Sequence, residues 1–368
     1  MLTSSWKAHD AGVTGLEFSP DGNVLATAGE DRTIKLWDQK ANLVNTLIGH
    51  TDMISSISFS PDSSKIATSH PYAHSFRLWK VDGTLLQEVT GDSKFEILGK
   101  ETVKFNPRSS SLLSAGYNGL LLWGLGGEQI KSIIDPDFTF TGISFSPDGK
   151  LFTSYRSPNT RIYKKDATLE LWKLDGEEIH LLNDLPGNKA AFSPDGQLIV
   201  TGGQDGFLRI VKLDGTLISS QVGHSQLITD VKFSPDGQII GSSSKDQTVK
   251  LWSRDGALIE TLKYSDMVNG ISFTPDSNIL GIAGGNGEID VWNLNVDYLL
   301  SHSCQWLQKY LENNPNVSKT DKNMCQGVAP LDKASNFLNV RFVPVNAPTM
   351  SRSGADYFSL PKFPDVFK

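Results

Sequence analysis

Two sets of four residues combine the side-chain types of a hydrolytic triad (a histidine, a hydroxyl and a carboxylate) with a tryptophan. The sets are His9, Thr27, Asp31 and Trp37, and His224, Ser242, Asp246 and Trp252. An acyl-transfer triad needs one exposed hydroxyl beside an oxyanion hole in a single site. A set that recurs at a fixed spacing is more typical of a buried polar brace, in which each member satisfies another. We therefore predict a structural role for both sets and no catalytic residue.

Other motifs with known chemistry are weak or missing from the sequence. It contains no Cys-x-x-Cys and no His-Glu-x-x-His, and the glycine-rich stretches 124–127 and 284–287 lack the lysine and the following helix of a phosphate loop. His70 and His74 are four residues apart and could share a metal ion. In a loop that spacing means little, so ordinary loop histidines are the favoured interpretation. We expect no metal site and no cofactor.

A short phrase that resembles Phe-Ser-Pro-Asp-Gly recurs seven times along the chain. Its copies begin at Phe18, Phe59, Phe105, Phe145, Phe192, Phe233 and Phe273. Proline presets φ for a turn, and Asp or Ser followed by Gly accepts the remaining turn dihedrals. The separations between copies are 40 to 47 residues, which is typical of four-stranded propeller blades.

Each phrase is followed by two further strand-like segments. The second of them alternates apolar and polar residues and ends in Trp in six units, for example at Trp37 and Trp252, whereas the fifth unit has Val211 there. A period of two is typical of half-buried strands. Asp-Gly or Gly-Gly pairs then follow in most units, as in tight β-hairpins. We therefore predict four short strands in each unit.

On these residues, the chain resembles the WD-repeat family over residues 1–294. The resemblance implies an all-β fold, a seven-bladed WD-repeat β-propeller in which the segment from Leu2 to Lys7 closes the ring as the outer strand of the last blade. It also implies that the two sets of four form a His–Ser/Thr–Asp–Trp hydrogen-bond network in their blades. In the second unit His50 and Thr68 are present, but Ala73 stands in place of the Asp.

The spacing of apolar residues becomes helical after Trp292, and we expect a short helical C-terminal appendage over residues 295–326. Residues 327–368 contain scattered prolines and polar residues and are expected to form a disordered tail. Residues 297–318 resemble the tail that ends many cyanobacterial WD-repeat proteins. In those proteins the propeller is often the sensing end of a signalling ATPase or a caspase-like protease.

Composition narrows the functional class. The chain has 38% hydrophobic and 20% charged residues and a formal net charge of −7, so a nucleic-acid partner is unlikely on electrostatic grounds. It contains no apolar run long enough for a membrane span and no signal peptide. Its two cysteines, Cys304 and Cys325, argue against a disulfide framework. We expect a cytoplasmic, monomeric propeller.

Departures from the repeat are the best places to look for binding, because loops on a rigid frame usually carry it. Irregular connections in the second to fourth units predict a protein-binding sector on one rim, and the adjoining openings of the inner strands add two methionines. The residues concerned are Tyr72, Tyr117, Tyr155, Arg156, Arg161, Tyr163, Lys165, Met53 and Met267. Tyr and Arg are enriched at interface hot spots. The alternatives are degenerate blades without a binding role and methionines that only pack.

These observations favour a non-catalytic protein–protein interaction platform or sensor propeller, in a signalling or defence assembly, with another protein as its partner. The alternative is a propeller hydrolase with a metal at the central channel. Such an enzyme needs converging carboxylates or histidines where the inner strands begin. Those points carry mainly Gly, Met, Thr, Leu and Asn, and Glu101 is the exception.

Overall fold

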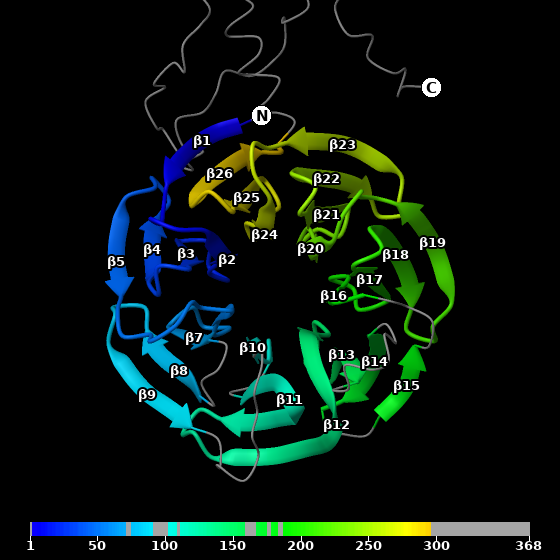
Figure 1. Ribbon diagram of the computed structural model, residues 1–368, viewed down its shortest axis with the longest axis horizontal. Coiled ribbons are helices and arrows are strands. Elements are labelled where there is room, and N and C mark those ends of the chain that lie inside the picture. The colour runs from blue at the N-terminus through cyan, green and yellow to red at the C-terminus, as the bar shows by residue number, and fades with distance from the viewer. Residues whose placement is uncertain are drawn as a thin grey trace, which may run out of the picture.

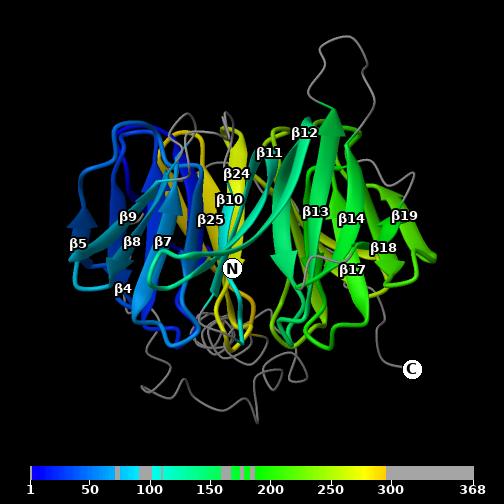
Figure 2. The same cartoon turned by 90° about the horizontal axis from the view of Figure 1, so that it is seen from below.

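The computed structural model describes residues 2–70, 75–90, 102–108, 111–158, 167–174, 178–182 and 187–295. These residues form 26 β-strands and no helix, and the strands are arranged as a propeller around a central channel (Figure 1). Seen from the side, the strands run between the two faces of the ring (Figure 2). Within this part of the chain, no helix is long and apolar enough to cross a membrane.

The strands form six antiparallel sheets, and five of these have four strands. The first two are β2 (Val13–Phe18), β3 (Val24–Gly29), β4 (Ile34–Asp38) and β5 (Leu43–Leu47), then β6 (Ser56–Phe59), β7 (Lys65–Ser69), β8 (Ser75–Lys80) and β9 (Leu85–Thr90). Two more are β16 (Lys189–Phe192), β17 (Leu198–Gly202), β18 (Phe207–Lys212) and β19 (Leu217–Val222), then β20 (Ile228–Phe233), β21 (Ile239–Ser244), β22 (Thr248–Ser253) and β23 (Leu258–Lys263).

The last four-stranded sheet joins the two ends of the described chain. It consists of β24 (Val268–Phe273), β25 (Ile279–Gly284), β26 (Glu288–Asn293) and β1 (Leu2–Lys7), and β1 is the outermost strand. Strands β1 and β26 are antiparallel, with Leu2 opposite Trp292 and Lys7 opposite Glu288. The segment that precedes the first phrase therefore completes the sheet that contains the last one.

The sixth sheet has six strands and replaces the separate third and fourth blades that the phrases predict. Its strands are β10 (Thr102–Phe105), β11 (Ser111–Gly124), β12 (Gln129–Phe145), β13 (Leu151–Pro158), β14 (Thr168–Lys173) and β15 (Glu178–Leu182). The first half of β11 pairs with β10 and its second half with β12. The second half of β12, from Phe138 to Phe145, pairs with β13. The long strands β11 and β12 thus each change their pairing partner about half-way along their length.

The phrase turns are built as the sequence predicts. In the first turn, Ser19 N donates to Val24 O (2.8 Å) and Ser19 Oγ donates to Asp21 Oδ1 (2.6 Å), while Gly22 has φ +73°. The equivalent hydroxyl of Ser60 and then the backbone of Ser64 lower the pKa of Asp62 to about 2. All seven inner strands end on the Phe of their phrase. The turn chemistry therefore fixes where each inner strand stops.

The hydrophobic core lies between neighbouring sheets. One buried cluster, for example, unites Ile34 and Leu36 of β4 with Phe59 of β6, Ile66 of β7 and Trp79 of β8. Burial of a side chain of this size contributes about 1.5–3 kcal/mol. Since each sheet offers one face to each neighbour, the apolar residues on both faces of a sheet are covered. Apart from Asn295, the predicted segments 295–326 and 327–368 lie outside the described residues.

Candidate functional site

Hydrogen bonds join the first set of four residues across the loop before β2, strand β3, the turn after it and strand β4. Trp37 Nε1 donates to Thr27 Oγ1 (2.9 Å), Thr27 Oγ1 lies 2.8 Å from His9 Nε2, and His9 Nδ1 lies 2.9 Å from Asp31 Oδ2. This geometry assigns the histidine proton to Nδ1, facing the carboxylate. His9 and Thr27 are both buried. The hydroxyl therefore has no access to a substrate.

The second set repeats this arrangement in the sheet of β20 to β23. Trp252 Nε1 donates to Ser242 Oγ (2.9 Å), Ser242 Oγ lies 2.8 Å from His224 Nε2, and His224 Nδ1 lies 3.1 Å from Asp246 Oδ2. The Asp246 carboxylate also accepts the backbone N–H of Ser225 (3.0 Å). Each set thus ties a loop before an inner strand to the strands behind it, as a structural brace does.

The electrostatics of the two sets favour a neutral histidine beside an ionised aspartate. Burial lowers the pKa of His9 below its ordinary value of 6.5, although Asp31 counteracts part of that effect. Burial also raises the pKa of the Asp31 carboxyl. The hydrogen bond from Thr33 and the proximity of His9 outweigh burial there, so that the pKa of Asp31 is below 3.8. The same causes act on His224 and Asp246.

The second blade keeps half of the brace. Trp79 Nε1 and His50 Nε2 both lie 3.0 Å from Thr68 Oγ1. His70 packs edge-on against His50, with ring centroids 5.2 Å apart, and neither Nδ1 atom has a hydrogen-bond partner in the described part of the structure. Burial, then Arg77 and His70, lowers the pKa of His50 to about 3. Ala73, which stands in the Asp place, is outside the described residues.

Two further Trp–hydroxyl pairs were missed by the sequence interpretation. Trp123 Nε1 donates to Ser114 Oγ (2.9 Å), and Trp172 Nε1 donates to Ser154 Oγ (3.0 Å). Neither blade has a histidine at the corresponding place, so the four-residue pattern was not recognisable. A hydroxyl residue nine or eighteen positions before the Trp was the only signal available.

Only part of the predicted binding sector lies within the described residues, and one of its residues is buried. Tyr155 is 0% exposed, and its hydroxyl donates to Lys189 O (3.2 Å). Burial raises the pKa of this phenol. The expectation that Tyr155 faces a partner is therefore wrong, because its ring lies in the core. Tyr72, Arg161, Tyr163 and Lys165 lie outside the described residues.

The remaining rim residues have different surroundings. Arg156 forms ion pairs with Asp135 and with Glu170 (3.4 Å), and its guanidinium carbon lies 3.7 Å from the centroid of Phe138. Tyr117 is 37% exposed, on β11. Met53 and Met267 are each 39% exposed, in the loops before β6 and β24. Arg156 is thus engaged within its own sheet, whereas Tyr117 and the two methionines remain accessible.

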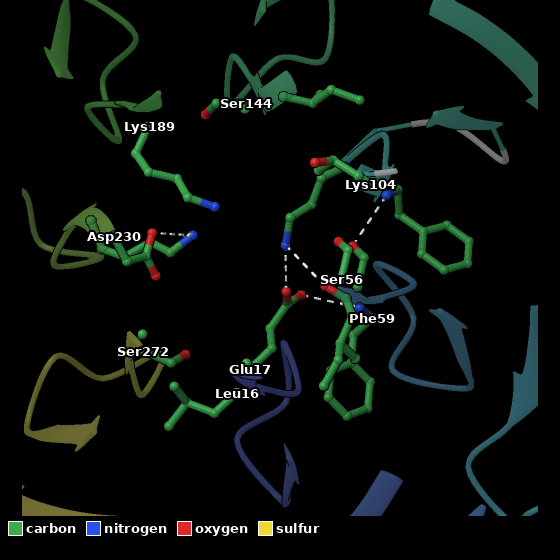
Figure 3. Close-up of a pocket in the computed structure, with 18 of the residues that line it drawn as sticks. Leu16, Glu17, Ser56, Phe59, Lys104, Ser144, Lys189, Asp230 and Ser272 are labelled. Carbon is green, nitrogen blue, oxygen red and sulfur yellow. Dashed lines mark hydrogen bonds and ion pairs between the residues drawn. The ribbon is translucent and has the colours of Figure 1, made fainter. Parts of the chain in front are cut away.

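The central channel contains a cavity of about 570 Å³, lined by inner strands all around the ring (Figure 3). Glu17 of β2 forms an ion pair with Lys104 of β10 (2.6 Å), and Lys104 also donates to Ile57 O (3.1 Å) of the blade between them. On the opposite side, Asp230 lies 3.8 Å from Lys232. Among the described residues, no three His, Cys, Asp or Glu side chains are grouped closely enough to hold a metal ion.

Side chains in the channel join one inner strand to the next. Phe18 N donates to Ser272 Oγ (3.2 Å), Phe59 N donates to Glu17 Oε1 (3.0 Å), and Phe105 N donates to Ser58 Oγ (3.1 Å). The three acceptors occupy the same place in their repeats, directly before the Phe. Because an inner strand is the edge of its sheet, these contacts give its backbone N–H groups acceptors on the neighbouring inner strand.

Comparison with known proteins agrees with this architecture. Residues 1–38, 41–80, 188–212 and 215–253 match the family described as WD domain, G-beta repeat. These four stretches match WD40 repeats and together cover less than half of the chain. The third and fourth phrase units, which share the six-stranded sheet, lie in the unmatched stretch between 80 and 188.

Similar curated proteins include an angio-associated migratory cell protein of Homo sapiens, 29% identical over 54% of this chain and 44% of its own length. The transcriptional corepressor LEUNIG_HOMOLOG of Arabidopsis thaliana is 27% identical over 55% of this chain and 25% of its own length. The nuclear distribution protein PAC1 of Candida albicans is 26% identical over 61% of this chain and 58% of its own length. The matches thus span about half, or less, of these relatives.

Proposed function

We propose that this chain is a non-catalytic protein-interaction platform, built on a seven-bladed ring. The observation that carries the proposal is the burial of the hydroxyl groups that a hydrolase would need. The hydroxyls of Thr27 and Ser242 are fully buried and are hydrogen-bonded within the braces. Accessible large side chains such as Tyr117, Met53 and Met267 lie on the rims instead. A rigid frame with exposed apolar residues on its loops suits the capture of another protein.

The count of seven blades rests on the six-stranded sheet. This sheet contains two phrase turns, after Phe105 and after Phe145, and its strands β11 and β12 exchange partners half-way along. We infer that it consists of two blades whose strands run on without a break. The pairing of β1 with β26 supports closure of the ring by the N-terminal strand, which covers the outer edge of β26.

A second candidate is a metal-dependent hydrolase at the channel, because Glu17 and Asp230 both line the cavity. Both carboxylates are engaged by protein groups. Glu17 accepts from Lys104 and Phe59 N, and Asp230 accepts from Ile271 N of β24 (3.4 Å). These contacts favour a role in holding the inner strands over a role in binding a metal.

The two candidates are separated by a pull-down of the tagged chain from its native cell, followed by mass spectrometry and by metal analysis of the same eluate. A stoichiometric protein partner that exchanges slowly supports the platform. Stoichiometric metal without a partner, together with hydrolysis of ester or phosphate model substrates, would overturn it.

We further propose that the chain works in the cytoplasm as the target-binding part of a signalling or defence assembly. Support comes from the likeness of residues 297–318 to the tail of cyanobacterial WD-repeat proteins. The relatives named above are eukaryotic, so this likeness stays a prediction. Co-purification of an ATPase or a protease with the chain would support it, and partners of unrelated classes would contradict it.

A further inference from the structure

Two loops of the ring present the same exposed Asp–Met unit. Asp52 and Met53 precede β6, and Asp266 and Met267 precede β24. In each unit the aspartate Oδ1 accepts the backbone N–H of its methionine (2.7 Å in both). Both methionines are 39% exposed. The two units therefore share one conformation and lie in the blades on either side of the first.

The loops of the first blade connect the two units. A Cβ on Gly12 would lie 3.0 Å from Gly285 O and 3.2 Å from Glu30 Cδ, and a Cβ on Gly285 would lie 2.8 Å from Met267 Cγ. Glu30, Gly12, Gly285 and Met267 are thus in direct contact. On the other side, Arg32 Nη1 donates to Thr51 O (3.4 Å), next to Asp52. The absence of side chains on the two glycines thus lets these loops pack closely against one another.

The loops that carry the two methionines and the loops of the first blade between them also carry carboxylates. Asp10 and Glu30 are exposed, and Asp52 and Asp266 are half-exposed. The nearby cations each already donate to a backbone carbonyl: Lys7 Nζ to Asn286 O (2.5 Å), Arg32 Nη1 to Thr51 O (3.4 Å) and Lys35 Nζ to Ala8 O (2.6 Å). We name the surface of Asp10, Glu30, Asp52, Met53, Asp266 and Met267 the Asp–Met rim. Its charge excess is negative.

The brace of the first blade holds this surface in place. Asp31 accepts from His9 Nδ1 and, at 3.4 Å, from Asp10 N, and Ala8 N and His9 N both donate to Gly287 O of the last blade (2.9 and 3.1 Å). The loop that carries Asp10 and Gly12 is therefore fixed before any partner arrives. A preorganised surface loses less conformational entropy when it binds.

We propose that the Asp–Met rim is the docking surface for a basic, amphipathic segment of a partner protein, one that offers lysine or arginine side chains together with apolar ones. The proposal rests on the proposed platform function and adds the chemistry of its partner. The carboxylates attract and orient the basic groups. The flexible, polarizable methionines adapt to the apolar side chains.

The test uses labelled peptides of one length and fluorescence anisotropy at physiological salt. The probes are a lysine–leucine peptide, a lysine–serine peptide and a glutamate–leucine peptide. The rim variant carries Asp10→Asn, Glu30→Gln, Asp52→Asn and Asp266→Asn, so that the oxygen that accepts the Met N–H is kept. The control variant removes the same number of carboxylates from hairpin turns elsewhere in the ring: Asp38→Asn, Asp82→Asn, Asp214→Asn and Asp255→Asn.

We expect the lysine–leucine peptide to bind the unmodified chain and the control variant alike, and to bind the rim variant about tenfold or more weakly. Met53→Gln with Met267→Gln should weaken the lysine–leucine peptide but not the lysine–serine peptide. Equal weakening in the rim and control variants would overturn the proposal, as would an absence of binding to the unmodified chain or a preference for the glutamate–leucine peptide.

The unmodified chain, the rim variant and the control variant, used as baits, distinguish this proposal from the platform function. Loss of the native partner from the rim variant alone, when that partner's bound segment is basic, supports both. A partner that all three proteins capture equally leaves the platform standing and overturns the Asp–Met rim. If no bait captures a protein, the platform function fails independently of the peptide result.

Discussion

At the scale of single residues, the same histidine position has two different environments. His9 and His224 each bond on both ring nitrogens, to a hydroxyl and to a carboxylate. His50 bonds only through Nε2, and a second imidazole, His70, stands against it. The contribution of the histidine to stability should therefore differ between the blades, although the local sequences are similar.

We predict that His9→Ala or His224→Ala lowers the free energy of unfolding by about 2–4 kcal/mol, because each strands a buried hydroxyl and leaves a carboxylate without its partner. His50→Ala should cost less, since only the Thr68 hydroxyl loses a partner. Urea denaturation of the three variants at pH 7 measures the difference. Equal losses in all three would contradict the assignment of the Asp as part of the brace.

Acid sensitivity should also originate in these histidines. In the folded chain the pKa values of His9 and His224 are below 6.5, and the pKa of His50 is lowered to about 3. Above pH 6.5 the folded and unfolded chains are both neutral at these sites. As the pH falls below 6.5 the unfolded chain takes up protons first, so stability is lost, by up to about 1.4 kcal/mol per pH unit and histidine.

This pH range lies above the one in which Asp62 affects stability. The pKa of Asp62 is about 2 in the folded chain and 3.8 ordinarily, so its contribution is lost only below pH 3.8. Between pH 6.5 and pH 4.5 we therefore predict that His50→Gln loses less stability than the unmodified chain. Urea midpoints at the two pH values give the comparison. An unchanged pH dependence would show that His50 does not carry this effect.

At the scale of strands and turns, the repeated phrase predicted the inner strands well, because a Pro-Asp-Gly turn imposes its own geometry. All seven inner strands end at the predicted Phe. The fusion of strands in β11 and β12 was not predictable, since it depends on pairing between segments and not on local turn residues. The burial of Tyr155 depends on distant glycines: a Cβ on Gly142 or Gly187 would lie 2.9 or 2.5 Å from its side chain.

The side-chain contacts between inner strands should be measurable one at a time. We predict that Ser58→Ala costs about 1 kcal/mol, because Phe105 N loses its acceptor. Ser144 occupies the same place in the fourth repeat. Ser144→Ala is the matched control and should cost less than half as much. Thermal denaturation of both variants measures the two stability losses. Equal losses for Ser58→Ala and Ser144→Ala would refute the role of Ser58.

At the scale of the whole molecule, the ring depends on a contact between segments almost 290 residues apart, β1 and β26. We predict that deletion of residues 2–7 exposes the edge of β26 together with the apolar surface that Trp6 covers. An open strand edge is a template for association. The truncated chain should melt at a lower temperature and elute as oligomers in size-exclusion chromatography. A monomeric chain of unchanged melting temperature would argue against closure of the ring by β1.

The antiparallel register of β1 and β26 also decides how the ring responds to tension. Leu2 lies opposite Trp292, so the polypeptide enters and leaves this sheet at the same end. A force between whatever flanks the two strands would load their hydrogen bonds one after another, as in unzipping, and not all together, as in shear. A pull on the two flanking segments, such as that of a bound partner moving away, would thus separate β1 from β26 at low force.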